Sequence, residues 1–130
     1  MIVTGKIVSG AKQAAFFTQL DWVQKQCDQK IGFKPFPGTL NIEISDETVK
    51  LLRSLRQEEI PELRAPDADS CSAKIIPVTI ENIQAAIVIP DEKVRVHGIN
   101  IIEIVSAVRL KDDLSLKDGD TVSFSITYKD

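Results

Sequence analysis

Residues 32–44, GFKPFPGTLNIEI, join a stiff turn directly to an alternating strand. The segment 32–38 contains two glycines and two prolines, which are typical of turns because they permit or fix special backbone angles. From residue 39 onward polar and apolar residues alternate, as in a strand with one face against a core. The apolar face is predicted to hold Leu40, Ile42 and Ile44, and the opposite face Thr39, Asn41 and Glu43.

The opposite face begins with two neutral, oxygen-bearing side chains, those of Thr39 and Asn41. At a rise of ~3.3 Å per residue, they start about 7 Å apart along the backbone. Hydroxyl and carboxamide oxygens are acceptable ligands for Mg²⁺, but without charge they bind the ion weakly. The pair therefore suits a site where nucleotide phosphates supply the negative charge. The alternative is an ordinary half-exposed strand that follows an ordinary turn.

Six strands are predicted, separated by turns rather than by regular helical crossovers. They lie at residues 2–9, 39–44, 73–80, 83–90, 99–105 and 121–128, and a tight turn at Glu81 and Asn82 joins the third to the fourth. Short helices are predicted at residues 17–31, 46–59 and 107–114. This pattern favours a mainly β fold, a compact barrel with peripheral helices, over a doubly wound sheet.

The predicted helices carry recognisable features at their ends and along one face. In residues 17–31 apolar side chains recur at steps of three and four, and Gly32 is well placed to end the helix. The face consists of Phe17, Leu20, Val23, Cys27 and Ile31. Ser45 suits the N-cap position of the helix at 46–59. The polar segment 61–70, which contains two prolines, is predicted to be a loop.

The composition indicates a folded domain without a nucleic-acid or membrane surface. With 130 residues, 43% of them apolar, the chain is long enough for one core, so residues 1–130 are expected to form a single domain. The formal net charge is -3 and the basic residues are scattered, whereas a nucleic-acid surface usually shows a basic stripe. No apolar run approaches the ~20 residues of a membrane span, and no signal-peptide pattern is present. A cytoplasmic location is expected.

The two cysteines, Cys27 and Cys71, are far apart in the chain, and neither has a nearby Cys or His. Their spacing is not that of a zinc site. They could form a disulfide, but cysteines of this kind are more often small, buried apolar residues. A reduced protein is therefore expected.

Residues 32–44 closely resemble the signature of the archaeal CTP-dependent riboflavin kinases, roughly G-F-x-P-Y-x-G-T-L-N followed by a strand. Further blocks similar to that family follow in the same order: IVSG at 7–10, AAIVIP at 85–90, IIEIV at 101–105 and RLKDDLSLKDGDTV at 109–122. Only residues 46–72 lie outside the resemblance. It implies a six-stranded cradle-loop barrel that phosphorylates the terminal ribityl hydroxyl of riboflavin with CTP, giving FMN.

The resemblance also implies roles for individual residues. Thr39 and Asn41 match the pair that holds Mg²⁺ in the family. Glu103 matches a carboxylate at the flavin site, where it would orient the attacking hydroxyl or accept its proton; the alternative is an exposed strand residue without a role. The residues that match nucleotide-binding segments are Gly10, Ala11, Lys12, Gln13, Ala14 and Ala15, and Val108, Arg109, Leu110 and Lys111. Arg109 and Lys111 would neutralise phosphate charge, or they are simply solvated side chains.

Two segments depart from the family pattern. After SG the family has a glycine-rich loop, G-x-G-E-G, whose backbone N–H groups approach the phosphates. Here Lys12, Gln13 and Ala14 stand in place of the later Gly-Glu-Gly, and each Cβ restricts positive φ and close approach to an anion. The segment 91–102 is longer than its counterpart and lacks a threonine that touches the flavin; His97 lies within it.

Three hypotheses for the function follow from these observations. The first is an active riboflavin kinase that binds Mg²⁺, CTP and riboflavin. The second is a non-catalytic relative that binds a flavin or a nucleotide, which the altered loop favours. The third is an interaction module, although the net negative charge argues against DNA. The expected partners are small molecules, and the expected state is a monomer or a weak homo-oligomer.

Overall fold

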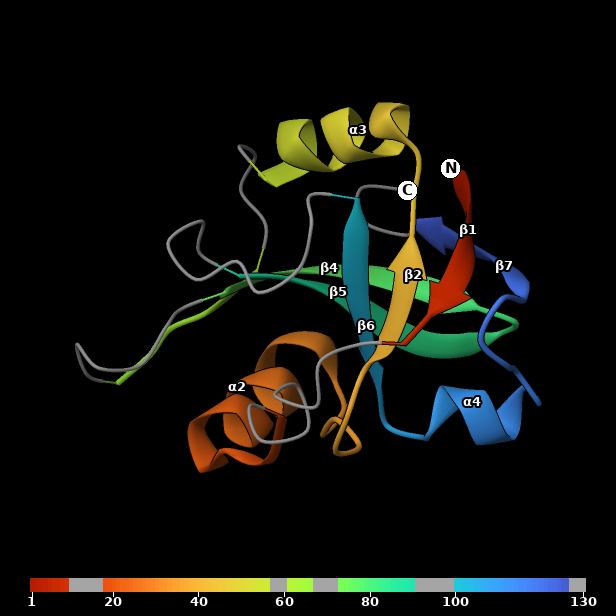
Figure 1. Ribbon diagram of the computed structural model, residues 1–130. Helices are drawn as coiled ribbons and strands as arrows, with labels where there is room; N and C mark the ends of the chain where they lie inside the picture. Colours follow the sequence, from red (N-terminus) through yellow and green to blue (C-terminus); the bar gives the residue numbers. More distant parts are fainter. Residues whose placement is uncertain (10–17, 57–60, 67–72, 91–99, 127–130) are drawn as a thin grey trace.

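The computed structural model describes residues 1–9, 18–56, 61–66, 73–90 and 100–126, which form an antiparallel barrel with helices packed around it (Figure 1). The strands are β1 (Ile2–Val8), β2 (Leu40–Glu43), β3 (Glu62–Leu63), β4 (Ala73–Ile80), β5 (Ile83–Pro90), β6 (Ile101–Ser106) and β7 (Thr121–Ile126). The helices are α2 (Asp21–Ile31), α3 (Asp46–Arg56) and α4 (Leu110–Asp113).

Six of the strands close into a barrel, as the sequence predicts. Neighbouring strands follow the order β4-β5-β6-β2-β1-β7, and β7 pairs again with β4 to complete the ring. Every pairing is antiparallel. Closure pairs the backbone groups that an open sheet would leave unpaired at its edges. In Figure 1, α3 lies on one side of the barrel, and α2 and α4 lie on the opposite side.

The prediction of a loop at 61–70 is wrong in one place, because β3 forms there and pairs with β4. The second residue of this strand, Leu63, is wholly buried. Helix α2 holds the strand: the Gln26 side chain exchanges two hydrogen bonds with the Arg64 backbone, at 2.7 and 2.8 Å, and Lys30 donates to the first carbonyl of β3. These contacts come from a distant helix, so no local sequence pattern indicates the strand.

Two apolar clusters pack against the barrel wall, one on its inner face and one on its outer face. The first fills the barrel and includes Ile7, Ile42, Ile76, Ile87, Ile104 and Phe124. The second lies between α2 and the outer face of the sheet and includes Val23, Cys27, Ile75, Ala86, Val88 and Val105. Successive residues of β4, β5 and β6 therefore enter different clusters, as the alternation of side chains along a strand requires. A polar side chain on the outer face of these strands lies beside an apolar cluster rather than in open solvent.

The predicted helix caps are confirmed. Gly32 adopts a left-handed conformation (φ 82°), and its N–H donates to the Cys27 carbonyl at 3.1 Å, which ends α2. The Ser45 hydroxyl accepts a hydrogen bond from the Thr48 N–H at 3.2 Å and so caps α3. The turn between β4 and β5 is also the predicted one. Both of its central residues, Glu81 and Asn82, have positive φ, as a tight hairpin requires.

Two predicted helices differ in extent from the structure. The helix expected at 17–31 is interrupted at Leu20, which is extended (φ -64°, ψ 136°): residues 18 and 19 are helical, and α2 starts at Asp21. Helix α4 is shorter than the predicted 107–114, because Arg109 is extended (φ -80°, ψ 101°) and the helix starts after it. An extended residue cannot continue the intrahelical hydrogen bonds, so each helix begins at the next residue. Phe17, also expected on the first helix, lies outside the described residues.

Cys27 is a free, buried thiol, and burial raises its pKa from 9.0 to about 11. In a Cys71→Ser variant we expect iodoacetamide to label Cys27 slowly at pH 8, because the thiolate is the reactive form. The neutral thiol stabilises the fold fully below about pH 9, and this contribution is lost as the pH rises toward 11. Mass spectrometry of the native and the guanidinium-unfolded variant measures the labelling. Equal labelling rates in the two states would contradict the burial of this thiol.

Candidate functional site

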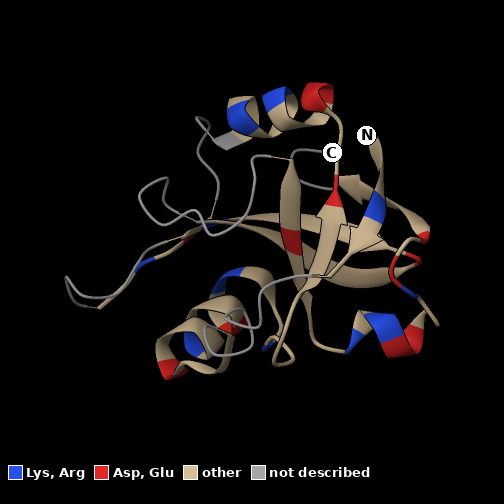
Figure 2. Cartoon of the chain, in the orientation of Figure 1, with Lys and Arg blue, Asp and Glu red and all other residues tan. Residues whose placement is uncertain are grey.

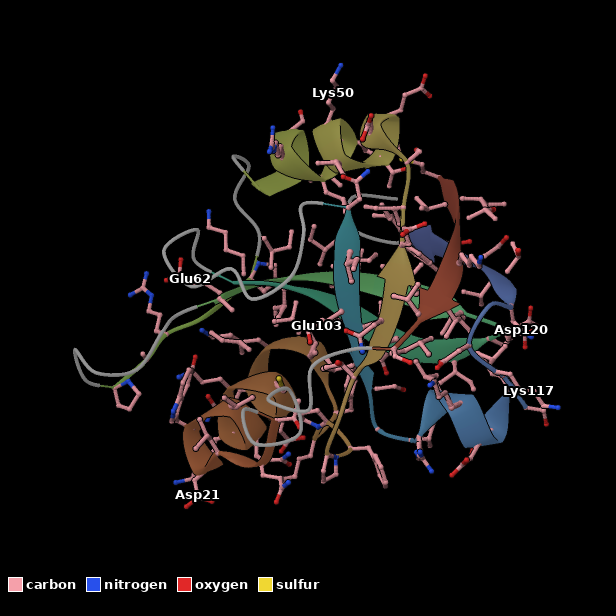
Figure 3. The ribbon with its side chains drawn as sticks, in the orientation of Figure 1. Asp21, Lys50, Glu62, Glu103, Lys117 and Asp120 are labelled. Atoms are coloured by element: carbon pink, nitrogen blue, oxygen red, sulfur yellow. The ribbon has the colours of Figure 1, made fainter. Side chains whose placement is uncertain are left out.

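One row of side chains crosses the outer face of the barrel wall. The strand registers place Val8 of β1 opposite Asn41 of β2, and Asn41 opposite Glu103 of β6. Glu103 in turn lies opposite Val88 of β5. Figure 3 shows Glu103 on the side of β6 that faces α2. The row therefore brings two of the predicted site residues together from strands that are far apart in the sequence.

The apolar and polar faces of β2 are arranged as predicted. Leu40 and Ile42 are buried in the barrel core, so Asn41, between them, points to the outer face. On the outer face, the Thr39 hydroxyl donates a hydrogen bond to Glu103 Oε1 at 3.2 Å, and both side chains are partly buried. Since the hydroxyl hydrogen is directed to the carboxylate, the lone pairs of the Thr39 oxygen remain available to a further partner.

Asn41 presents an oxygen without a partner. The residue is only 7% exposed, and its Oδ1 atom is buried without a hydrogen bond. An unsatisfied buried acceptor costs about 1–3 kcal/mol, so such an atom points to an absent ligand, water or ion. Oxygens from a hydroxyl and a carboxamide fit the preference of Mg²⁺. The described ranges contain no group of three or more His, Cys, Asp or Glu side chains able to hold a metal.

The Pro/Gly turn before β2 is fixed by hydrogen bonds from three directions. The N–H of Gly38 donates to the hydroxyl of Thr18 at 2.9 Å, and the N–H of Phe36 donates to the last carbonyl of β6 at 2.7 Å. The Gln24 side chain donates to the Pro35 carbonyl at 2.8 Å. Gly38 has φ 116°, a conformation that suits glycine. The turn thus determines where the chain enters β2 and where the Thr39 side chain points.

The two basic residues predicted beside a nucleotide are each paired with a carboxylate. Arg109 Nη1 lies 3.1 Å from Asp112 Oδ2, and Lys111 Nζ lies 2.7 Å from Asp118 Oδ1. The guanidinium pair is well exposed, whereas the Lys111 side chain is 34% exposed. Leu110, between them, is buried against the barrel core.

Several predicted site residues cannot be placed. The segments 10–15 and 91–99, the second of which contains His97, lie outside the described residues. Val108 is partly buried against the barrel core. The structure therefore brings Thr39, Asn41 and Glu103 together and places 108–111 in a separate segment that follows β6.

Charged side chains lie mostly on the helices and turns rather than on the barrel wall. Figure 2 shows Lys or Arg together with Asp or Glu on each of α2, α3 and α4. None of the helices in the described ranges has the length and apolarity needed to cross a membrane. On β6, Glu103 is the one charged residue, which makes its carboxylate the main ionisable group of the row.

Comparison with known proteins identifies the family. The family model for CTP-dependent riboflavin kinases, described as "Domain of unknown function DUF120", matches residues 7–126. The chain belongs to this family. Riboflavin kinases from Archaeoglobus fulgidus and Saccharolobus solfataricus are 35% and 36% identical to it over 128 and 129 residues, each time 95% of this chain. The matches cover 54% and 73% of those relatives, so the chain spans little more than half the length of the first.

Further residues, not predicted from the sequence, build the surroundings of the site in this riboflavin-kinase-family barrel. Thr18 and Gln24 hold the Pro/Gly turn, and Asp118 receives hydrogen bonds from Lys111 and from Ser9. Ser9 lies in the family-like block IVSG, and Asp118 lies in KDGD within the block at 109–122. Their place in these blocks could have indicated a role near the site. Thr18 and Gln24 had no such signal, because their role depends on where the turn folds back.

Proposed function

We propose that the chain transfers a phosphoryl group from CTP to the terminal ribityl hydroxyl of riboflavin, giving FMN. The observation that carries this proposal is the outer-face cluster of Thr39, Asn41 and Glu103, in which the buried Asn41 Oδ1 lacks a protein partner. Relatives that align with nearly the whole chain are named riboflavin kinase, and the family is named for CTP. The proposed partners are accordingly a flavin and a nucleotide.

Thr39 Oγ1 and Asn41 Oδ1 would hold Mg²⁺, together with phosphate oxygens of the nucleotide. The bound ion would neutralise phosphate charge and orient the groups that react. Uncharged protein ligands suit this arrangement because the phosphates provide the negative charge. Because the Thr39 hydroxyl donates its hydrogen to Glu103, the lone pairs of the hydroxyl oxygen would be available to hold the ion.

Glu103 is the proposed base. Its position opposite Asn41 means that a ribityl hydroxyl beside its carboxylate would also lie near the metal-bound phosphate. The hydroxyl oxygen forms a bond to the γ-phosphorus while the bond from that phosphorus to the bridging oxygen breaks. CDP leaves with this electron pair, and the hydroxyl proton passes to Glu103. The same carboxylate therefore orients the acceptor and receives its proton.

Residues 10–15 and 108–111 are the proposed nucleotide-binding segments. Val8, near the end of β1, lies opposite Asn41 of the proposed metal site. Lys12 replaces a glycine of the family loop, and its ammonium group would supply positive charge where backbone N–H groups otherwise do. Arg109 and Lys111 would add charge from the second segment, each already oriented by a carboxylate.

A non-catalytic flavin-binding relative is the second candidate. The observation in its favour is the replacement of the loop glycines by Lys12, Gln13 and Ala14, since a flexible ammonium does not reproduce a rigid set of backbone donors. This candidate predicts that the chain binds riboflavin or FMN without binding a nucleotide.

Calorimetric titration tests the two candidates. The purified chain is titrated with riboflavin, FMN, CTP and ATP, each in the presence of Mg²⁺ and again with EDTA. The proposal predicts binding of riboflavin, and binding of CTP that requires Mg²⁺ and exceeds that of ATP. Flavin binding without nucleotide binding would favour the non-catalytic relative. Binding of neither would contradict both.

A further inference from the structure

The turn before β7 is fastened to the end of β1. The Gly119 N–H donates to the Ile7 carbonyl at 2.7 Å, and the Ile7 N–H donates to the Asp120 carbonyl at 2.8 Å. Within the turn, the Lys117 N–H donates to Asp120 Oδ2 at 2.8 Å. Figure 3 shows Lys117 and Asp120 in this turn, next to α4. The turn thus lies between the end of β1 and α4 and is rigidly attached to the first of them.

Asp118, at the centre of this turn, connects two separate segments of the chain. The Ser9 hydroxyl donates to its Oδ2 atom at 2.5 Å, and the Lys111 ammonium donates to its Oδ1 atom at 2.7 Å. Each carboxylate oxygen therefore has one partner. The hydrogen bonds from Lys111 and Ser9 lower the pKa of Asp118, so the carboxylate stays charged at neutral pH. Ser9 directly precedes residue 10, and Lys111 ends the segment 108–111.

We propose that Asp118 is a positioning residue for nucleotide binding, which holds the Lys111 ammonium at a fixed place beside Ser9, at the end of β1, before the nucleotide arrives. This inference rests on the proposed function. Neither Ser9 nor Asp118 belongs to the predicted nucleotide-binding residues, and Asp118 acts only through its two partners.

Charge and geometry support this role over a purely structural one. A bond between an ammonium and a carboxylate is stronger than a neutral hydrogen bond, and it fixes a long, flexible side chain that otherwise samples many rotamers. The Lys111 side chain is 34% exposed and the Asp118 side chain 49% exposed, so the pair is partly open to solvent. Loss of a partly exposed pair changes the free energy of unfolding little. It does release Lys111 and Ser9, so its main effect should be on ligand binding.

Three variants and a matched control test the role of Asp118. Asp118→Asn removes the charge that orients Lys111, Ser9→Ala removes the other contact, and the double variant combines them. Asp113→Asn makes the same charge change at an exposed position of α4. Each protein is titrated with CTP in Mg²⁺ and with riboflavin, and its melting temperature is measured.

We expect Asp118→Asn to raise the Kd for CTP about tenfold, with the Kd for riboflavin and the melting temperature nearly unchanged. In the double variant, the loss of binding free energy for CTP should be no larger than the sum of the two single losses, because both changes break one network. Asp113→Asn should bind CTP like the unmodified chain. Equal losses of affinity for both ligands, or a CTP affinity unchanged in Asp118→Asn, would overturn the inference while leaving the kinase proposal intact. An unmodified chain that binds no CTP would overturn both.

Discussion

Replacing Asn41 with alanine should abolish Mg²⁺-dependent binding of CTP while leaving the thermal stability nearly unchanged. The change removes one of the two proposed metal ligands, so the affinity for the Mg²⁺–CTP complex should fall at least about tenfold. It also removes a buried oxygen that lacks a hydrogen bond. The relief of that unsatisfied acceptor, about 1–3 kcal/mol, offsets the packing lost with the side chain. Calorimetric titration and thermal melting of the variant measure the two effects.

Asn100→Ala is the matched control for this variant, because its amide has a structural role. Asn100 Nδ2 donates to Asp46 Oδ1 at 2.7 Å and to the Ile44 carbonyl at 3.2 Å, which joins the start of β6 to the start of α3. Its loss should lower the melting temperature and leave the affinity for CTP unchanged. If Asn41→Ala instead destabilises the fold as Asn100→Ala does and keeps its nucleotide affinity, then Asn41 is structural.

Gly5→Ala should cost about 3 kcal/mol or more of the free energy of unfolding, because an added methyl group has no space. A Cβ atom at Gly5 would lie 2.6 Å from the carbonyl oxygen of Glu43 and closer still to Cγ2 of Ile42. Gly5 pairs with Val122 of β7, and on its other side the absence of a Cβ leaves room for Ile42 and Glu43 of β2. A backbone oxygen cannot move without disturbing the barrel. Urea unfolding of the variant measures the loss.

Gly119→Ala separates this steric effect from the general cost of replacing a glycine. No atom lies within 4 Å of the added Cβ at Gly119, but φ is 95°, so the substitution strains the backbone by about 1–2 kcal/mol. We expect Gly5→Ala to unfold at a clearly lower urea concentration than Gly119→Ala. The same midpoint for both variants would show that β1 and β2 are not as close at Gly5 as the structure places them.

Much of the barrel could be predicted because its strands carry local patterns. Alternation in β2, the hairpin turn at Glu81 and Asn82, and the cap at Gly32 are properties of neighbouring residues, and each appears in the structure as predicted. The strand β3 could not be predicted, because Leu63 and its neighbours are held by α2 rather than by their own pattern. The late start of α4 was missed because Arg109, an acceptable helix residue, is extended there.

The candidate site was predicted only in part, because local patterns indicate some of its features and not others. The alternation of β2 was enough to place Thr39 and Asn41 on one face, but their proximity to Glu103 depends on the register between β2 and β6, which no local pattern determines. The unpaired Oδ1 atom of Asn41 is likewise visible only in the folded chain. Asp118 joins Lys111, seven residues before it, to Ser9, which is 109 residues away in the sequence, so only the structure shows this network.

Formation of FMN tests the central claim most directly. The purified chain is incubated with riboflavin, Mg²⁺ and CTP or ATP, and the flavins are separated by chromatography and measured by fluorescence. The account predicts that FMN accumulates with CTP, that EDTA abolishes it, and that Asn41→Ala and Glu103→Gln reduce it strongly. A chain that binds riboflavin and Mg²⁺–CTP yet forms no FMN would contradict the account, because the groups proposed to carry out the transfer would all be occupied without reaction.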